Sequence, residues 1–133
     1  MASGFKWYPQ ARRGVASDVA RALSETAAAV VADVEERQVV PHAEAATKPG
    51  HVAGMLASSV SVDATRAQQG AVRIVWDAPF AARAYFHPEW EFSQAVHGSA
   101  RGRWMDDYME GGARADFAPR AYAKALRRGR WFR

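Results

Sequence analysis

The stretch VASDVARALSETAAAVVADV, residues 15–34, decides the fold of this chain. Its large apolar side chains recur at steps of three and four residues, with Ala27 filling one gap and Thr26 at the edge: Val15, Val19, Leu23, Val30, Val31 and Val34. This spacing places them along one side of an α-helix. Charged residues close the pattern, and Pro41 stops the helix because proline has no N–H and disfavours helical backbone in the residue before it.

Two short apolar runs follow this predicted helix and indicate a β-hairpin. Between the helix and the hairpin, residues 41–55 contain two prolines and two glycines and are typical of a loop. LASSVSV, residues 56–62, alternates so that Leu56 and Val60 share one face of a strand. AVRIVW, residues 71–76, alternates in the same way, and the polar stretch DATRAQQG joins the two runs. We therefore predict an antiparallel pair of strands.

The second half of the chain predicts two further helices. Pro79 and Pro88 break residues 77–97, and FAARAYF between them allows either a short helix or a strand. Ser99 is suited to cap a helix whose apolar face would hold Trp104, Met105, Tyr108 and Met109, ending at the glycines after Glu110. A last helix starts at Asp116 or Ala118 and ends before Gly129, with apolar residues on one face and basic residues on the other.

Both ends of the chain are expected to lie outside the domain of residues 15–128. Residues 1–14 form an arm that is aromatic at Phe5, Trp7 and Tyr8 and also basic; it folds back on its own core or reaches a neighbour. Residues 129–133 form a basic tail past the last helix. The basic group near this end is either a solvated helix end or a contact for DNA or an acidic partner. Its members are Arg127, Arg128, Arg130 and Arg133.

Composition bounds the class of protein. A chain of 133 residues with 49% apolar residues is expected to fold as one domain. It has no cysteine, which excludes disulfides, thiolate metal sites and cysteine nucleophiles. The longest apolar run is too short to span a bilayer, and residues 1–14 lack the apolar core of a secretory signal. We expect a soluble protein of the cytoplasm, without a membrane partner.

The residues that carry catalysis in other proteins occur here without the required spacing. Two H-x-E triplets begin at His42 and His87, but a zinc deaminase also needs a P-C-x-x-C motif. Ser58, Ser59 and Ser61 have no G-x-S-x-G motif around them, and no G-K-[ST] phosphate loop is present. We therefore expect no enzyme activity, no catalytic residue, no metal and no cofactor.

One segment has more aromatic side chains than so small a core is expected to hide. WDAPFAARAYFHPEWEF, residues 76–92, contains six aromatic rings. Large rings left outside a core are typical interface anchors, because they cover much area at a low cost in entropy. The alternative is a fully buried aromatic core. We predict interface roles for one tryptophan further along the chain and five residues of this segment: Phe80, Tyr85, Phe86, Trp90, Phe92 and Trp104.

The order of these features resembles the minor capsid or tail-completion family of long-tailed phages, the proteins of the head–tail neck. GMLASSVSV resembles the start of the family's first strand, with Gly54, Leu56 and Ser59 at the matching positions. VRIVWDAPFAARAYF is similar to the family's next segment through Phe80, Ala81 and Tyr85. FAPRAYAKAL is similar to the start of its last helix, and Trp104 resembles a tryptophan of the minor capsid branch.

This resemblance implies a fold, a function and partners. The fold is α+β, with a long N-terminal helix packed on a small twisted antiparallel sheet and a C-terminal helix beside it. The function is structural: a ring of identical subunits, expected to be a hexamer, that joins the connector to the tail in the virion after assembly in the host cytoplasm. Implied partners are the connector or stopper protein and the tail-terminator or tail-tube protein, and DNA is a non-specific contact. Alternatives are a tail terminator, a head-closure protein, or a small basic DNA-associated protein.

Overall fold

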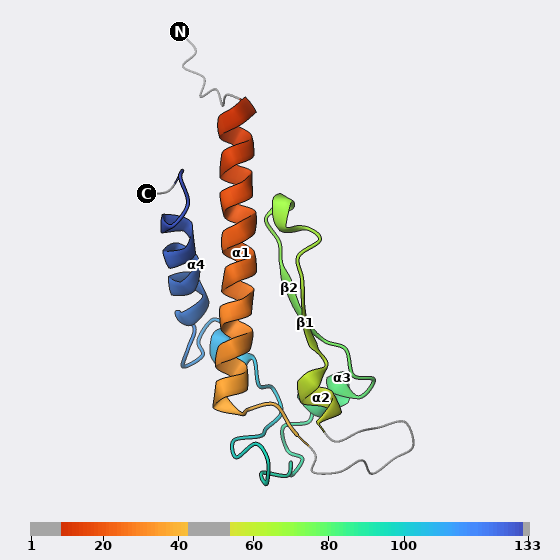
Figure 1. Cartoon of the computed structure of the whole chain (residues 1–133). Helices are drawn as coiled ribbons and strands as arrows, with labels where there is room; N and C mark the ends of the chain where they lie inside the picture. The colour runs from red at the N-terminus through yellow and green to blue at the C-terminus, as the bar shows by residue number, and fades with distance from the viewer. Residues whose placement is uncertain (1–8, 43–53, 132–133) are drawn as a thin grey trace.

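The computed structural model describes residues 9–42 and 54–131, with side chains from Ala11 onward in the first range, and it has the α+β architecture expected (Figure 1). A long N-terminal helix, a two-stranded antiparallel sheet and a C-terminal helix are its main elements. In chain order the elements are α1 (Pro9–Arg37), α2 (Met55–Ser58), β1 (Val60–Asp63), the 3-10 turn η1 (Ala67–Gln69), β2 (Arg73–Trp76), α3 (Ala81–Tyr85), the 3-10 turn η2 (Asp106–Tyr108) and α4 (Phe117–Arg127).

Helix α1 is longer than its apolar stripe. It begins at Pro9, a residue well suited to the first helical turn, because its missing N–H would have no partner there. The predicted boundary of the N-terminal arm is therefore wrong for residues 9–14, which are helical; residues 1–8 lie outside the described part of the chain. The helix ends at Arg37 because Gln38 takes a left-handed backbone, with φ of 54°.

The hairpin is confirmed, but its first strand is shorter than predicted. β1 pairs antiparallel with β2, with Val60 opposite Trp76 and Asp63 opposite Arg73. Residues 55–58 form the short helix α2 instead of continuing the strand. Two local features favour this turn. Gly54 precedes it with a left-handed φ of 71°, and the Ser59 hydroxyl donates to the Leu56 carbonyl at 2.7 Å. The alternation of LASSVSV predicted a strand, but local serine hydrogen bonds offer the backbone a helical alternative.

The helix predicted from Ser99 to Glu110 is also wrong. Only the 3-10 turn η2 forms within this stretch, because the chain before it is tied to α3. The Arg103 N–H donates to the Tyr85 carbonyl at 2.9 Å. Gly102 is buried so close to the chain after α3 that a Cβ there would lie 2.8 Å from the Cα of Pro88. Arg103 itself has a left-handed φ of 48°, which a continuous helix does not allow.

Two halves of the molecule differ in how many layers they contain. In the upper half of Figure 1, α4, α1 and the hairpin lie side by side in a single layer, with α1 in the middle. α4 packs along α1 through Arg21, whose guanidinium donates to the Ala125 carbonyl at 3.2 Å. The tip of the hairpin, with buried Ala67, packs against the other side of α1. In the lower half, α2, α3 and residues 99–116 surround the end of α1.

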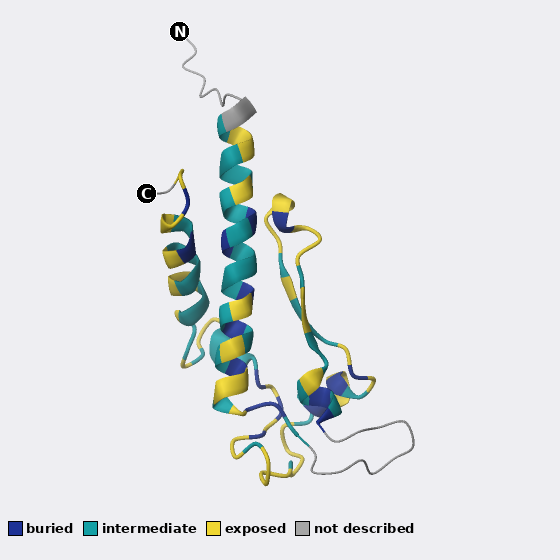
Figure 2. Ribbon diagram, viewed as in Figure 1, coloured by how far each residue is buried: buried dark blue, intermediate teal, exposed yellow. Residues whose placement is uncertain are grey.

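The core lies in the lower half, as the dark blue residues of Figure 2 show. Trp104 and Val34 are its most enclosed large side chains, and Val30, Val39, Val40 and Leu56 pack with them. Of the 15 buried apolar residues described, nine are alanine. Alanines let elements approach closely but bury little area each, so the upper half in particular is held by little apolar burial.

Candidate interaction surfaces

Trp104 was predicted to lie in an interface, and this prediction is wrong. The side chain is 1% exposed and lies at the centre of the core. Its ring makes edge-to-face contacts with Trp76 and Tyr85, with centroids 5.7 Å and 4.9 Å away. Such T-shaped pairs are favoured by the charge distribution of aromatic rings. The apolar ring therefore serves the chain's own stability, because its neighbours already cover it completely.

The other five predicted interface residues divide between the core margin and the surface. Phe80, Tyr85 and Phe92 are partly buried against the core. Burial, followed by a 2.9 Å hydrogen bond from its hydroxyl to Asp106, raises the pKa of Tyr85 to about 12. Phe86 and Trp90 are 62% and 42% exposed and remain candidates for an interface.

The exposed aromatic rings and the polar residues beside them form a surface that we call the aromatic end. Its members are Phe86, His87, Glu89, Trp90 and Glu91. The His87 and Trp90 rings stack face to face, 4.2 Å apart and 7° from parallel. The His87 Nδ1 and the Glu89 carboxylate are 2.7 Å apart, and this hydrogen bond lowers the pKa of Glu89. The Arg103 guanidinium lies 5.8 Å from the Phe86 ring centre. Rings held in one rotamer lose less entropy when a partner binds.

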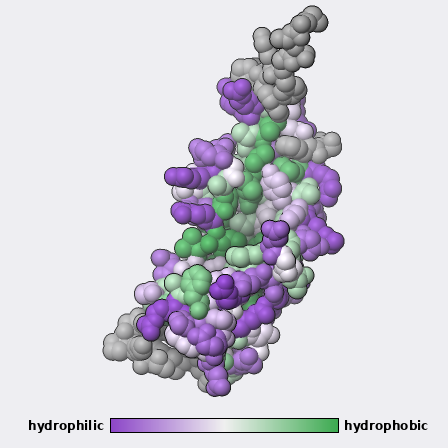
Figure 3. Space-filling model, turned by 180° about the vertical axis from the view of Figure 1, so that it is seen from behind, coloured by the Kyte–Doolittle hydropathy of each residue, from purple (hydrophilic) through white to green (hydrophobic). Residues whose placement is uncertain are grey.

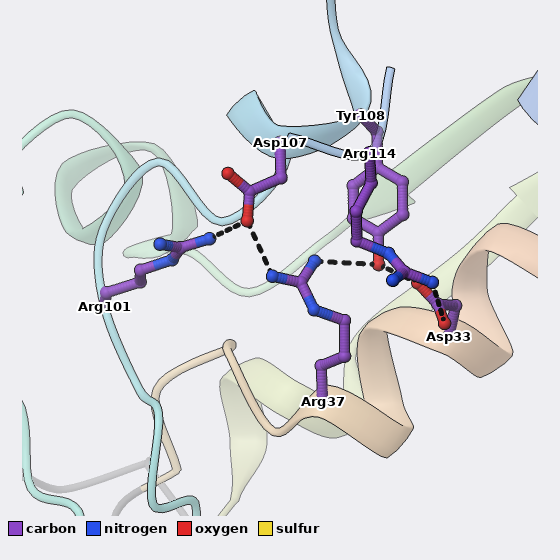
Figure 4. Close-up of polar contacts among 6 residues, drawn as sticks. All are labelled: Asp33, Arg37, Arg101, Asp107, Tyr108 and Arg114. Atoms are coloured by element: carbon purple, nitrogen blue, oxygen red, sulfur yellow. Dashed lines mark hydrogen bonds and ion pairs between the residues drawn. The ribbon is translucent and has the colours of Figure 1, made fainter. Parts of the chain in front are cut away.

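A second cluster lies in the lower half on the side of α1 that carries Asp33 and Arg37 (Figure 4). We call it the ion-pair network, and its members are Asp33, Arg37, Arg101, Asp107, Tyr108 and Arg114. Arg114 donates to both carboxylate oxygens of Asp33, at 2.7 and 2.8 Å. The Tyr108 hydroxyl donates to Asp33 at 2.5 Å. Arg37 bridges the cluster, since it donates to Asp107 at 2.6 Å and to the Tyr108 oxygen at 3.1 Å.

This network attaches residues 101–116 to α1. Hydrogen bonds from Arg37 and then Arg101 lower the pKa of Asp107, so its carboxylate stays ionised in the folded state. Both carboxylates accept hydrogen bonds from arginines, and Asp33 also accepts one from the Tyr108 phenol. Of the two neighbouring aspartates, Asp106 pairs with Arg103 at 3.0 Å, whereas Asp107 turns to Arg37 and Arg101.

In the upper half, the described residues place no such cover on the same side of α1. Steps of three and four residues lead from Arg37 and Asp33 through Val30 back to Thr26, Leu23, Val19 and Val15. The last four are only half-buried, and we call them the open face. Seen from behind, an apolar stripe runs down the middle of the upper half (Figure 3). It is the part of the predicted stripe that the described elements of the chain enclose only partly.

The basic C-terminal group is only partly available to a partner. Arg128 forms an ion pair with Glu25 of α1. Arg127 is exposed, Arg130 lies over the Trp131 ring at 5.3 Å, and Arg133 lies outside the described residues.

The predicted free tail after residue 128 is also wrong, as far as residue 131. The Trp131 N–H donates to Asp18 at 3.1 Å, and its ring occupies the space beside Gly14. The reason is that glycine at position 14 leaves room on α1 for a flat ring.

In the described part of the chain, no group of three metal-ligating side chains converges, and no helix has the length and apolarity needed to cross a membrane. The His97 Nδ1 is 2.7 Å from the Val40 carbonyl, and the His97 ring lies 4.8 Å from that of His42. A hollow beside His97, lined also by Val34 and Trp76, has a free volume of about 10 Å³, which is room for a single water.

Comparison with models of known families, with curated proteins and with solved structures gives no match to this chain.

Proposed function

We propose that this protein is a structural subunit of the head–tail junction of a long-tailed phage, where identical copies form a ring between connector and tail. The observation that carries the proposal is the single-layer upper half with its open face. One layer of elements cannot cover both of its own sides, so stable architectures place a second layer on the apolar side. In a ring, the second layer is the next subunit.

Two further features support a structural role. The aromatic end presents rigid rings at the opposite end of the molecule from the open face, as interface anchors do. The polar clusters of the described residues are charge-paired and internally satisfied, which suits a scaffold. In the resembled family, such subunits join connector to tail, and a hexamer is the proposed ring here. The proposed subunit is a tail-completion or minor capsid protein, and the alternatives are a tail terminator and a head-closure protein.

The test is genetic and structural. A phage genome that encodes this chain is deleted for its gene, and the lysate is imaged by electron microscopy. We expect separate filled heads and free tails, restored to joined particles when the gene is supplied in trans. Mass spectrometry of purified virions should detect the protein in every particle preparation. Normal joined particles without the gene product would contradict the proposal.

A DNA-associated protein is the second candidate, favoured by the exposed basic face of α4. Arg120, Lys124 and Arg127 are exposed on this helix. Binding through phosphates should weaken steeply with salt, because each neutralised phosphate releases counterions. Titration of duplex DNA at several salt concentrations checks this. Tight binding with a slope of several phosphates by the isolated subunit would favour this candidate over the ring.

A further inference from the structure

We propose that copies of this chain associate head to tail, with the aromatic end of one copy covering the open face of the next. This inference deepens the ring proposed above, since it names the two surfaces that meet. It does not require that the oligomer belong to a phage. The occupant of the open face is therefore a second copy of the protein.

The two surfaces have matching chemistry in their apolar parts. Val15, Val19 and Leu23 present aliphatic side chains along one line of α1, each half-buried. Trp90 and Phe86 present flat rings that are exposed and held by their own stacking and cation contacts. A ring laid across aliphatic side chains removes apolar area from water on both partners, which favours association.

Charge complementarity selects this pairing over two like surfaces. Residues 77–97 contain one arginine against three carboxylates, a net charge of −2 with neutral histidines, and the Arg103 guanidinium over Phe86 reduces this to −1. Glu89 and Glu91 flank Trp90 within it, and both are exposed. Residues 116–131, on α4 beside the open face, contain five basic residues against one aspartate, a net charge of +4. Two aromatic ends would repel each other, and so would two α4 faces.

Arg12 strengthens this complementarity at the open face itself. It lies on the same line of α1, one helical turn before Val15 and Ala16, and it is exposed. When Trp90 of one copy docks on this face, Glu89 or Glu91 beside it can form an ion pair with Arg12 of the next copy. Pairs at the edge of an apolar contact set orientation and partner choice more than affinity.

The aromatic end and the open face lie at different places on the molecule, so a contact between them in two copies is heterologous. The aromatic end lies after α3 at the lower end of Figure 1, whereas the open face lies on the upper half of α1. One molecule cannot satisfy its own two surfaces at such a separation. Copies joined through two different patches form a chain or, when the rotation closes, a ring.

Two matched variants test the contact. Phe86→Ala/Trp90→Ala removes the aromatic anchors, and Val19→Glu puts a charge on the open face. Ala28→Glu is the control for the second, because Ala28 is exposed on a different side of the same helix. Glutamate is a good helix former, so both variants are expected to keep the helix and to place the same charge on different sides of it. Sedimentation velocity is run on each protein alone and on equimolar mixtures, and circular dichroism checks folding.

We expect wild type and Ala28→Glu to assemble, and each interface variant to sediment alone as a monomer. A mixture of the two interface variants should give a dimer and nothing larger, because one intact aromatic end meets one intact open face. Should the aromatic-end variant prove unfolded, Trp90→Ala alone provides the same readout. Assembly of either interface variant to the wild-type size would overturn the inference.

Wild-type assembly without a dimer in the mixture would also overturn the inference, since it would point to a contact between like surfaces. That outcome leaves the phage function standing. Conversely, joined particles in a phage lacking the gene would end the proposed function while the head-to-tail contact could still be measured.

Discussion

The lower and upper halves of the molecule use the same side of α1 in different ways. In the lower half, Asp33 and Arg37 lie under residues 101–116 and bind Arg114, Tyr108 and Asp107. In the upper half, Val15, Val19 and Leu23 continue the same line with no element of the described chain laid over them as a second layer. Within the described residues, the polar part of this helix side is therefore closed by contacts inside the chain, while its apolar part has no covering second layer.

The difference also separates two kinds of stability. The lower half has an enclosed tryptophan, a valine cluster and satisfied ion pairs. The upper half has alanine contacts, the hydrogen bonds from Arg21 to the end of α4, and the packing of Trp131 on α1. We expect variants of the lower half to change the folding of the isolated chain. Variants of the open upper surface should change association first.

The largest effect is expected for Trp104→Ala, which tests whether the lower half is closed. Removing a fully buried indole should lower the free energy of unfolding by about 3–5 kcal/mol. Trp90→Ala, at an exposed tryptophan, should cost less than about 1 kcal/mol. Urea unfolding of dilute, dissociated protein measures both. Equal losses for the two tryptophans would remove the contrast between core and interface.

Asp33→Asn tests the ion-pair network that closes the lower half. The change keeps the shape of the side chain but removes the charge that binds Arg114 and Tyr108, and should cost about 1–3 kcal/mol. Asp116→Asn is the matched control, since the Asp116–Arg120 pair is largely exposed and such pairs contribute at most about 1 kcal/mol. Thermal melts compare them. If the control loses as much stability as Asp33→Asn, the network does not hold residues 101–116 in place.

A pH titration tests the contribution of Asp107 to the ion-pair network. The pKa of Asp107 is lowered from 3.8 in the folded state, chiefly by Arg37, so the folded protein binds fewer protons than the unfolded chain as the pH falls through that range. Its contribution to stability is present above pH 3.8 and is lost as the pH drops through the lowered pKa. Asp107→Asn should flatten the acid limb of the plot of unfolding free energy against pH. An unchanged limb would show that Asp107 has the same pKa in both states.

The smallest effect is expected in the upper half, where the Trp131 ring packs beside Gly14 of α1. A Cβ at residue 14 would lie 1.9 Å from the Trp131 Nε1, so Gly14→Ala displaces the ring while raising helix propensity. With Trp131→Ala in the background the clash is gone, and Gly14→Ala should stabilise by about 1 kcal/mol. A double-mutant cycle by denaturant unfolding gives the coupling between the two sites. No coupling would show that the C-terminal segment does not pack on α1.

The sequence predicted those elements whose signal is local and periodic. The spacing of Val19, Leu23 and Val30 indicated α1, two β-branched runs indicated the hairpin, and the faces of residues 117–127 indicated α4. The α+β fold follows from these three. The aromatic surplus predicted rings outside the core, and Phe86 and Trp90 are exposed, while their interface role stays a prediction.

Features that depend on contacts distant in sequence were not predictable in this way. Trp104 carries the same local signal as an exposed tryptophan, and only the approach of Trp76 and Tyr85 encloses it. The ion-pair network joins α1 to residues some 70 positions later, as in the Arg37–Asp107 bond, and charge spacing within a helix gives no sign of it. Gly14 could have been a clue, since a glycine inside a helix often marks a close approach.

We propose that another copy of the chain covers the open face of α1. Sedimentation equilibrium of the purified wild-type protein over a wide concentration range tests this proposal, with Val19→Glu measured alongside. We predict a mass that rises above the 14.6 kDa of one chain and approaches a fixed multiple of it, while Val19→Glu stays at one chain. A wild-type mass of 14.6 kDa at every concentration would contradict the account.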